Sequence, residues 1–174
     1  KKLAIESDWE YKAMNAIQSE KRDLFNARFR WIQGKKHNPV KGGKDWLRYV
    51  FERFFAIEEL IKTENLENYW HFDSDTMILK DLRVFEERLR EANIDCTTLC
   101  NDTCPSGFIK TGFTENYTNS IISYFEDDKL LTQQQREFDV DKPENAFTEM
   151  RAFTIHRKNN RIKATFNNQS SVDI

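Results

Sequence analysis

The stretch that decides the fold is Tyr69-Trp70-His71-Phe72-Asp73-Ser74-Asp75. Its first four residues have the aromatic bias of a β-strand, and two aspartates follow directly after them. Residues 45–62, before it, carry a broad apolar helical face, and residues 81–90, after it, again have helical spacing. Helix, strand and helix in succession predict an α/β fold with a mixed, mainly parallel sheet flanked by helices. Ligands of such sheets bind beyond the carboxyl ends of the strands, where we expect Asp73 and Asp75 to lie.

Similar patterns extend along the rest of the chain. Residues 9–31 have the spacing of an amphipathic helix, and residues 33–44 contain the glycines and lysines typical of an exposed loop. Downstream, we expect strands at residues 107–109 and 162–166 and a helix at 119–125. An irregular polar segment is expected at 127–143 and a compact apolar pattern at 146–154. Residues 167–174 are expected to form a frayed tail.

The composition predicts one compact domain spanning residues 1–174, since 39% hydrophobic and 13% aromatic residues can form one sizeable core. The 29 acidic and 27 basic residues nearly cancel, so no basic field favours nucleic acid or an anionic membrane. No apolar run approaches the ~20 residues of a membrane helix, and the start lacks a signal peptide's apolar region. We therefore expect a cytoplasmic protein without a transmembrane segment. The sequence does not start with Met, which leaves open that it is a fragment of a longer chain.

Two carboxylates separated by one residue at the end of a strand can share a cation. A hard divalent cation, Mn²⁺ or Mg²⁺, prefers oxygen ligands and keeps coordination positions for a diphosphate. It then neutralises the charge that accumulates on a departing nucleoside diphosphate. The alternative is a polar turn in which Asp73 and Asp75 each cap the following helix. Strand alternation puts His71 and Asp73 on one face of the sheet and Phe72 on the other.

Sequence blocks around this pair resemble a known family. One block, Phe51-Glu52-Arg53-Phe54-Phe55, resembles a helix of GT-A glycosyltransferases. A later block, the DxD motif Asp73-Ser74-Asp75, resembles the metal-binding strand of the same family. The strand whose small residues line the donor sugar in this family is similar to Cys104-Pro105-Ser106-Gly107-Phe108-Ile109. The family's acidic segment on the acceptor side is similar to Phe147-Thr148-Glu149-Met150. The blocks occur in the family's order, and the nearest likeness is to enzymes of large algal (chlorella) viruses and certain bacteria.

The resemblance implies a GT-A (Rossmann-like) domain that moves a sugar from a nucleotide sugar, taken to be a UDP-sugar, to a glycan or another hydroxyl acceptor. It implies Mn²⁺ or Mg²⁺ on Asp73 and Asp75, and a catalytic role for Glu149. The donor-binding residues that it implies are Arg53, Asp73, Ser74, Asp75, Ser106 and Gly107. For a viral protein, the corresponding location is the host cytoplasm.

Two features of the family are not recognisable in this sequence. The first strand and loop, which hold the nucleobase, do not stand out near the N-terminus. No histidine motif supplies a third metal ligand, for which His156 and Asp173 are the candidates. Arg53 either orients Asp73 or the donor, or forms a structural salt bridge. Glu149 either positions the reacting groups or is an exposed residue at a helix start.

Two other functions remain compatible with the sequence. Phosphohydrolases of the haloacid dehalogenase type also place two aspartates after an apolar strand, but their motif requires Thr or Val where this chain has Met77. The second is a module that binds nucleotide sugars on a GT-A scaffold without catalysis. Cys96, Cys100 and Cys104 have no nearby His to complete a zinc site, so we interpret them as reduced structural thiols.

Overall fold

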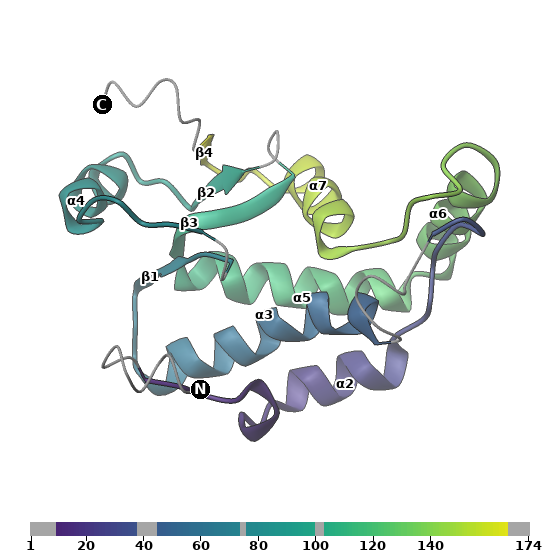
Figure 1. Cartoon of the computed structure of the whole chain (residues 1–174), viewed down its shortest axis with the longest axis horizontal. Coiled ribbons are helices and arrows are strands. Elements are labelled where there is room, and N and C mark those ends of the chain that lie inside the picture. Colours follow the sequence, from purple (N-terminus) through teal and green to yellow (C-terminus); the bar gives the residue numbers. More distant parts are fainter. Residues whose placement is uncertain (1–9, 38–44, 74–75, 100–102, 167–174) are drawn as a thin grey trace.

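The computed structural model describes residues 10–37, 45–73, 76–99 and 103–166 (Figure 1). In chain order, the elements are η1 (Met14–Ala16), α2 (Glu20–Arg28), α3 (Trp46–Thr63), β1 (Asn68–His71), α4 (Arg83–Glu91), β2 (Cys96–Leu99), β3 (Cys104–Lys110), α5 (Thr111–Glu126), α6 (Asp128–Val140), α7 (Glu149–Asn159) and β4 (Ala164–Phe166). They form an α/β fold with a four-stranded mixed sheet. No helix within these ranges combines the length and apolarity that crossing a membrane requires.

The sheet has the strand order β1-β3-β2-β4. β3 pairs antiparallel with β1, where His71 lies opposite Gly107, and antiparallel with β2, where Leu99 lies opposite Cys104. β4 pairs parallel with β2 after a long crossover through α5, α6 and α7. In the described part of the chain, β1 is therefore an edge strand, and the chain leaves it toward Asp73.

Side chains of β1 and β3 alternate between the two faces of the sheet. Tyr69 and Ile109 belong to the main core, which is shared with α3, α5 and α7. Trp70 and Phe108 pack instead with Leu89 of α4. Because side chains along a strand alternate with a period of two, α4 covers one face of the sheet and the main core covers the other.

Helices α2, α3 and α5 lie side by side on the main-core face (Figure 1). Phe25 of α2 stacks on Phe55 of α3 with ring centroids 5.1 Å apart, and it meets Phe125 of α5 edge-on at 5.2 Å. All three rings are buried. Burial of each such side chain contributes about 2–3 kcal/mol, so these aromatic contacts hold the helix layer together.

A buried carboxylate joins the same three helices through polar contacts. Glu58 of α3 accepts hydrogen bonds from Lys21 of α2 at 2.7 Å, from Lys62 at 2.6 Å and from Thr118 of α5 at 2.6 Å. Burial raises the pKa of the Glu58 carboxyl, but these three donors outweigh burial and hold the pKa below its ordinary value of 4.5. Glu58 therefore stays ionised inside the helix layer.

Most of the expected elements are confirmed, including the helices at residues 45–62 and 81–90 and the strands at 107–109 and 162–166. The helix expected over residues 9–31 is reduced to η1 and α2. The irregular segment expected at 127–143 is wrong, because α6 occupies most of it. Asp127 caps α6 by accepting from the amides of the second and third residues after it. Only a narrow stripe of α6 is apolar, and that stripe is buried.

The expectation of a mainly parallel sheet is also wrong for the described strands, since two of the three pairings are antiparallel. The sequence analysis does not predict β2, which ends at Leu99, shortly before β3 begins at Cys104. Such a connection is far shorter than the dozen or more residues that a parallel crossover needs. The two strands therefore pair antiparallel.

We expect Glu58→Gln to lower the free energy of unfolding by about 2–3 kcal/mol near pH 7, because Lys21 and Lys62 lose the buried carboxylate that they share. Urea unfolding measures this change. Because folding lowers the pKa of Glu58, the advantage of the wild type is present above pH 4.5 and disappears as the pH falls through the folded-state pKa.

Glu115→Gln is the matched control for this prediction. Glu115 approaches the same Lys62 at 3.8 Å, but its side chain is half exposed. Its replacement should therefore cost less than about 0.5 kcal/mol. Equal losses in Glu58→Gln and Glu115→Gln would show that burial of Glu58 contributes nothing to stability.

Candidate functional site

One guanidinium group joins three segments that are far apart in the sequence. Arg53 of α3 donates through Nη1 to Oδ1 of Asp73 at 2.8 Å, and through Nη2 to Oε1 of Glu149 at 3.1 Å. Asp73 follows the end of β1, and Glu149 is the first residue of α7. We call these three residues the Arg53 cluster. It brings together residues that the sequence analysis names for donor binding, for metal binding and for catalysis.

The packing of α3 determines where Arg53 lies. Phe54 and Phe55 are buried in the main core, and the guanidinium of Arg53 lies over the ring of Phe54 at 5.2 Å. The Nε of Arg53 is buried and has no hydrogen-bond partner among the described residues. A buried donor without a partner costs about 1–3 kcal/mol. In the described part of the chain, the guanidinium of Arg53 therefore keeps an unsatisfied N–H inside the protein.

Strand alternation brings Asp73 to the face of the sheet on which Arg53 lies. The ring of His71 lies 6.0 Å from that of Phe54 of α3, while Trp70 and Phe72 stack on each other at 6.1 Å. This confirms the expected placement of His71 and Asp73 on one face and Phe72 on the other. The Asp73 side chain is 58% exposed despite its bond to Arg53, so it can accept a further ligand.

The helix-capping alternative does not hold for Asp73. The next helix, α4, begins at Arg83, and the carboxylate that accepts the Arg83 amide, at 3.0 Å, is that of Asp81. The backbone carbonyl of Asp73 accepts a bond from the amide of Thr76 at 3.0 Å. The carboxylate of Asp73 is therefore not engaged in capping α4.

Glu149 is buried at the start of α7 and only 7% exposed. The backbone amides of Glu149 and Met150 lie near its carboxylate, while the side chain of Thr148 makes no capping bond. Burial raises the pKa of the Glu149 carboxyl above 4.5, although Arg53 and the two amides act in the opposite direction. The alternative that Glu149 is an exposed helix-start residue is therefore wrong.

Strand β3 brings Ser106 and Gly107 to the same end of β1. Gly107 pairs with His71, and Oγ of Ser106 donates to the carbonyl of His71 at 3.4 Å. Gly107 has a φ of 86°, a backbone conformation that residues other than glycine avoid. The backbone therefore requires glycine here independently of any ligand. Both residues are buried. Contact between these residues and a donor sugar stays a prediction.

His71 does not contribute positive charge to this site. Burial and the Arg53 cation both lower the pKa of its imidazole, and Asp73 offsets this only in part. The ring is therefore neutral near pH 7. The positive charge beside Asp73 comes from Arg53.

Ser74, Asp75 and Asp173 lie outside the described residues. His156, the other candidate for a third metal ligand, is buried on α7, where its Nδ1 lies 2.9 Å from Oγ of Ser120. Burial lowers the pKa of His156 to about 4. Within the described ranges, no contact joins His156 to Asp73.

Among the candidate metal ligands, the described residues include Asp73 but not Asp75. No group of three or more His, Cys, Asp and Glu side chains in the described chain is placed to hold a metal. Asp73 does supply an exposed carboxylate, the oxygen ligand that Mn²⁺ and Mg²⁺ prefer. One or two carboxylates suffice where phosphates and waters complete the coordination shell. Asp73 can therefore supply one carboxylate ligand to such a cation.

Tyr117 is a further residue of this site that the sequence patterns did not predict. Tyr117 of α5 is fully buried, and its hydroxyl donates to the backbone carbonyl of Glu149 at 2.6 Å. The helical spacing of Phe113, Tyr117 and Ile121 is a signal of burial. Spacing alone does not indicate which helix the hydroxyl meets.

We expect Arg53→Gln to destabilise the protein by about 2–4 kcal/mol near pH 8, because Glu149 then keeps a buried charge without its cationic partner. The loss should shrink near pH 5. The substitution raises the pKa of Glu149 further, so between pH 4.5 and that pKa the folded state binds more protons than the unfolded state. Stability therefore rises as the pH falls. Urea unfolding at both pH values measures the difference.

The double variant Arg53→Gln, Glu149→Gln is the control for this prediction. It has no carboxylate at position 149, so the dependence on pH between about 5 and 8 should be lost. If Arg53→Gln alone loses the same stability at both pH values, the pairing of Arg53 with Glu149 is not what stabilises this region.

Comparison of the chain with protein-family models, with curated proteins and with solved structures finds no match.

Proposed function

We propose that this chain is a metal-dependent glycosyltransferase of the GT-A type, which transfers a sugar from a UDP-sugar or another nucleotide sugar to a hydroxyl group of a glycan or other acceptor. The observation that supports this most is the Arg53 cluster, in which α3, the end of β1 and the start of α7 meet. These segments contain sequence blocks that resemble the family. Ser106 and Gly107, from another such block, adjoin the end of β1.

Each residue has a separate role in this proposal. Asp73 and Asp75 hold Mn²⁺ or Mg²⁺, and the bound cation supplies positive charge against the departing diphosphate. Arg53 orients Asp73 by bonding its Oδ1, and it adds a positive charge that a phosphate oxygen can reach. Glu149 bonds the other end of the guanidinium and keeps it from turning.

The two alternative functions are less well supported. In a phosphohydrolase of the haloacid dehalogenase type, an aspartate acts as nucleophile. Here Oδ1 of Asp73 is engaged by Arg53, and β1 is an edge strand of the described sheet, antiparallel to its neighbour. A non-catalytic module would bind the nucleotide sugar without turnover, so assays of donor transfer and donor hydrolysis distinguish it from an enzyme.

We expect Asp73→Asn and Asp75→Asn each to abolish the Mn²⁺-dependent rise in Tm that a bound UDP-sugar gives the wild type, because the cation loses a carboxylate ligand. A thermal-shift screen of several UDP-sugars, with and without Mn²⁺, measures this. Asp81→Asn is the matched control, since Asp81 lies farther along the same connection and pairs with Arg83. Donor and Mn²⁺ binding as tight in Asp75→Asn as in the wild type would refute the proposal.

Glu149→Gln separates a positioning role from acid-base catalysis. Because its buried carboxylate bonds Arg53, we expect the substitution to loosen Arg53 and to weaken donor binding by about 3–10-fold, with turnover falling as well. A catalytic Glu149 would instead lower turnover by ~10²-fold and leave donor affinity almost unchanged. Both quantities are measured on one preparation. If neither changes, Glu149 has no part in the site.

A further inference from the structure

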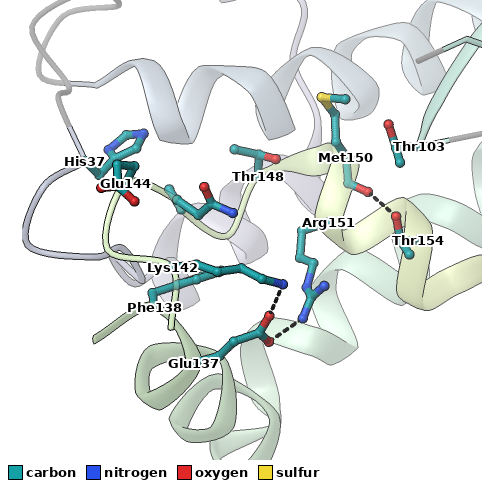
Figure 2. A pocket seen from close by; sticks show the side chains of 12 residues that line it. His37, Thr103, Glu137, Phe138, Lys142, Glu144, Thr148, Met150, Arg151 and Thr154 are labelled. Atoms are coloured by element: carbon teal, nitrogen blue, oxygen red, sulfur yellow. Dashed lines mark hydrogen bonds and ion pairs between the residues drawn. The ribbon is translucent and has the colours of Figure 1, made fainter. Parts of the chain in front are cut away.

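A cavity of about 460 Å³ lies between the end of α6 and the start of α7 (Figure 2). Glu137 and Phe138 of α6 form one side, and Thr148, Met150 and Arg151 form another. The volume lies within the range of small-molecule sites. Thr148 and Met150 flank Glu149 in the chain, so the cavity borders the turn that carries one member of the Arg53 cluster.

Two cations share one carboxylate inside this cavity. Lys142 donates to Oε1 of Glu137 at 2.7 Å, and Nη2 of Arg151 bonds the other oxygen of the same carboxylate (Figure 2). The Nε of Arg151 donates to Gln134 at 2.7 Å, which fixes the orientation of the guanidinium. These three charged groups therefore carry a net charge of about +1. A second anion would balance it.

Among the described residues, the other charged residue of the lining is Glu144, and several of the remaining groups are polar. Glu144 is well exposed and faces Lys36, an exposed lysine outside the lining, at 3.9 Å, so solvent and this lysine screen its charge. The Nδ1 of His37, which also lines the cavity, is buried without a partner among the described residues. Asn145 adds an amide to the lining, and the side chain of Thr148 is not used as a helix cap.

We propose that this cavity binds the acceptor through an oxyanion, the carboxylate or phosphate of an acidic sugar. Arg151 and Lys142 bind the oxyanion, while the amide and hydroxyl groups of the lining bond the hydroxyls of the sugar. The identification of this ligand as the acceptor rests on the proposed glycosyltransferase function. The binding of an acidic sugar in the cavity follows from the charges and groups that line it.

The test is an equilibrium titration of the full chain with three probes: D-glucuronate, D-glucose 6-phosphate and D-glucose. NMR measures binding without nucleotide sugar or Mn²⁺. We expect at least one acidic sugar to bind about tenfold more tightly than glucose, because glucose has no group for the unbalanced charge. The stronger of the two acidic probes identifies the anion as carboxylate or phosphate. Glucose binding as tightly as both acidic probes would overturn the proposal.

Three substitutions test the site, and they should respectively lower, raise and leave unchanged the affinity for the acidic sugar. Lys142→Gln removes one cation and should weaken binding of the acidic sugar by about fivefold or more. Glu137→Gln releases both cations from their shared carboxylate and should tighten binding. Lys129→Gln, an exposed lysine of α6 outside the cavity, should change nothing. An unchanged affinity in both Lys142→Gln and Glu137→Gln, or an equal loss in Lys129→Gln, would refute the site.

The outcome for the cavity can be told apart from the outcome for the proposed function. Titration with the acidic sugars needs no donor, metal or turnover, so it holds or fails independently of Asp73→Asn and Asp75→Asn. With donor present, Lys142→Gln should raise KM for the acidic acceptor and leave donor affinity unchanged. A lower donor affinity with an unchanged acceptor KM would place the cavity on the donor side and overturn its assignment to the acceptor.

Discussion

Burying the carboxylate of Glu149 costs several kcal/mol unless a cation pairs with it, and Arg53 is the cation that α3 brings to it. The same guanidinium also bonds Asp73, so the start of α7 and the end of β1 are both tied to one side chain of α3. The helix layer and the edge of the sheet therefore meet at a fixed point. The proposed donor site depends on that point, because Asp73 has no other described side-chain partner.

The Glu58 carboxylate and the Arg53 cluster differ in how completely their polar groups are satisfied. Glu58 is buried and receives bonds from two lysines and a hydroxyl, which leaves it little capacity for a ligand. In the Arg53 cluster, the Asp73 carboxylate is mostly exposed and the Nε of Arg53 has no described partner. Complete satisfaction is typical of polar groups that stabilise a fold, whereas remaining capacity is what a binding site needs.

Sequence patterns predicted the parts of this fold that depend on local periodicity. Tyr69 to Asp73 alternate between the two faces as expected, and α3 and α4 lie where helical spacing placed them. The expectation failed at α6, where the apolar stripe is narrow, and at β2, which is short and rich in threonine. The resemblance named Arg53, Asp73 and Glu149. A contact in which Arg53 orients Asp73 was one of the alternatives for Arg53, and the structure contains it. The bond between Arg53 and Glu149 could not be predicted, because bonds across long stretches of chain leave no local pattern.

The pairing of β4 with β2 closes a large loop. The backbone amide of Lys163 bonds the carboxylate of Asp95 across 68 residues of chain, and α5, α6 and α7 all lie between them. Contacts over such distances form slowly, because the entropy of loop closure is lost before the contact is gained, whereas helices and their near neighbours form early. The helix layer also depends on such contacts, since Lys21 of α2 reaches Thr118 of α5 across 97 residues, so the layer and the crossover both need long-range closure. The cavity between α6 and α7 is lined by residues from His37 to Thr154, so it is complete only once contacts of this length have formed.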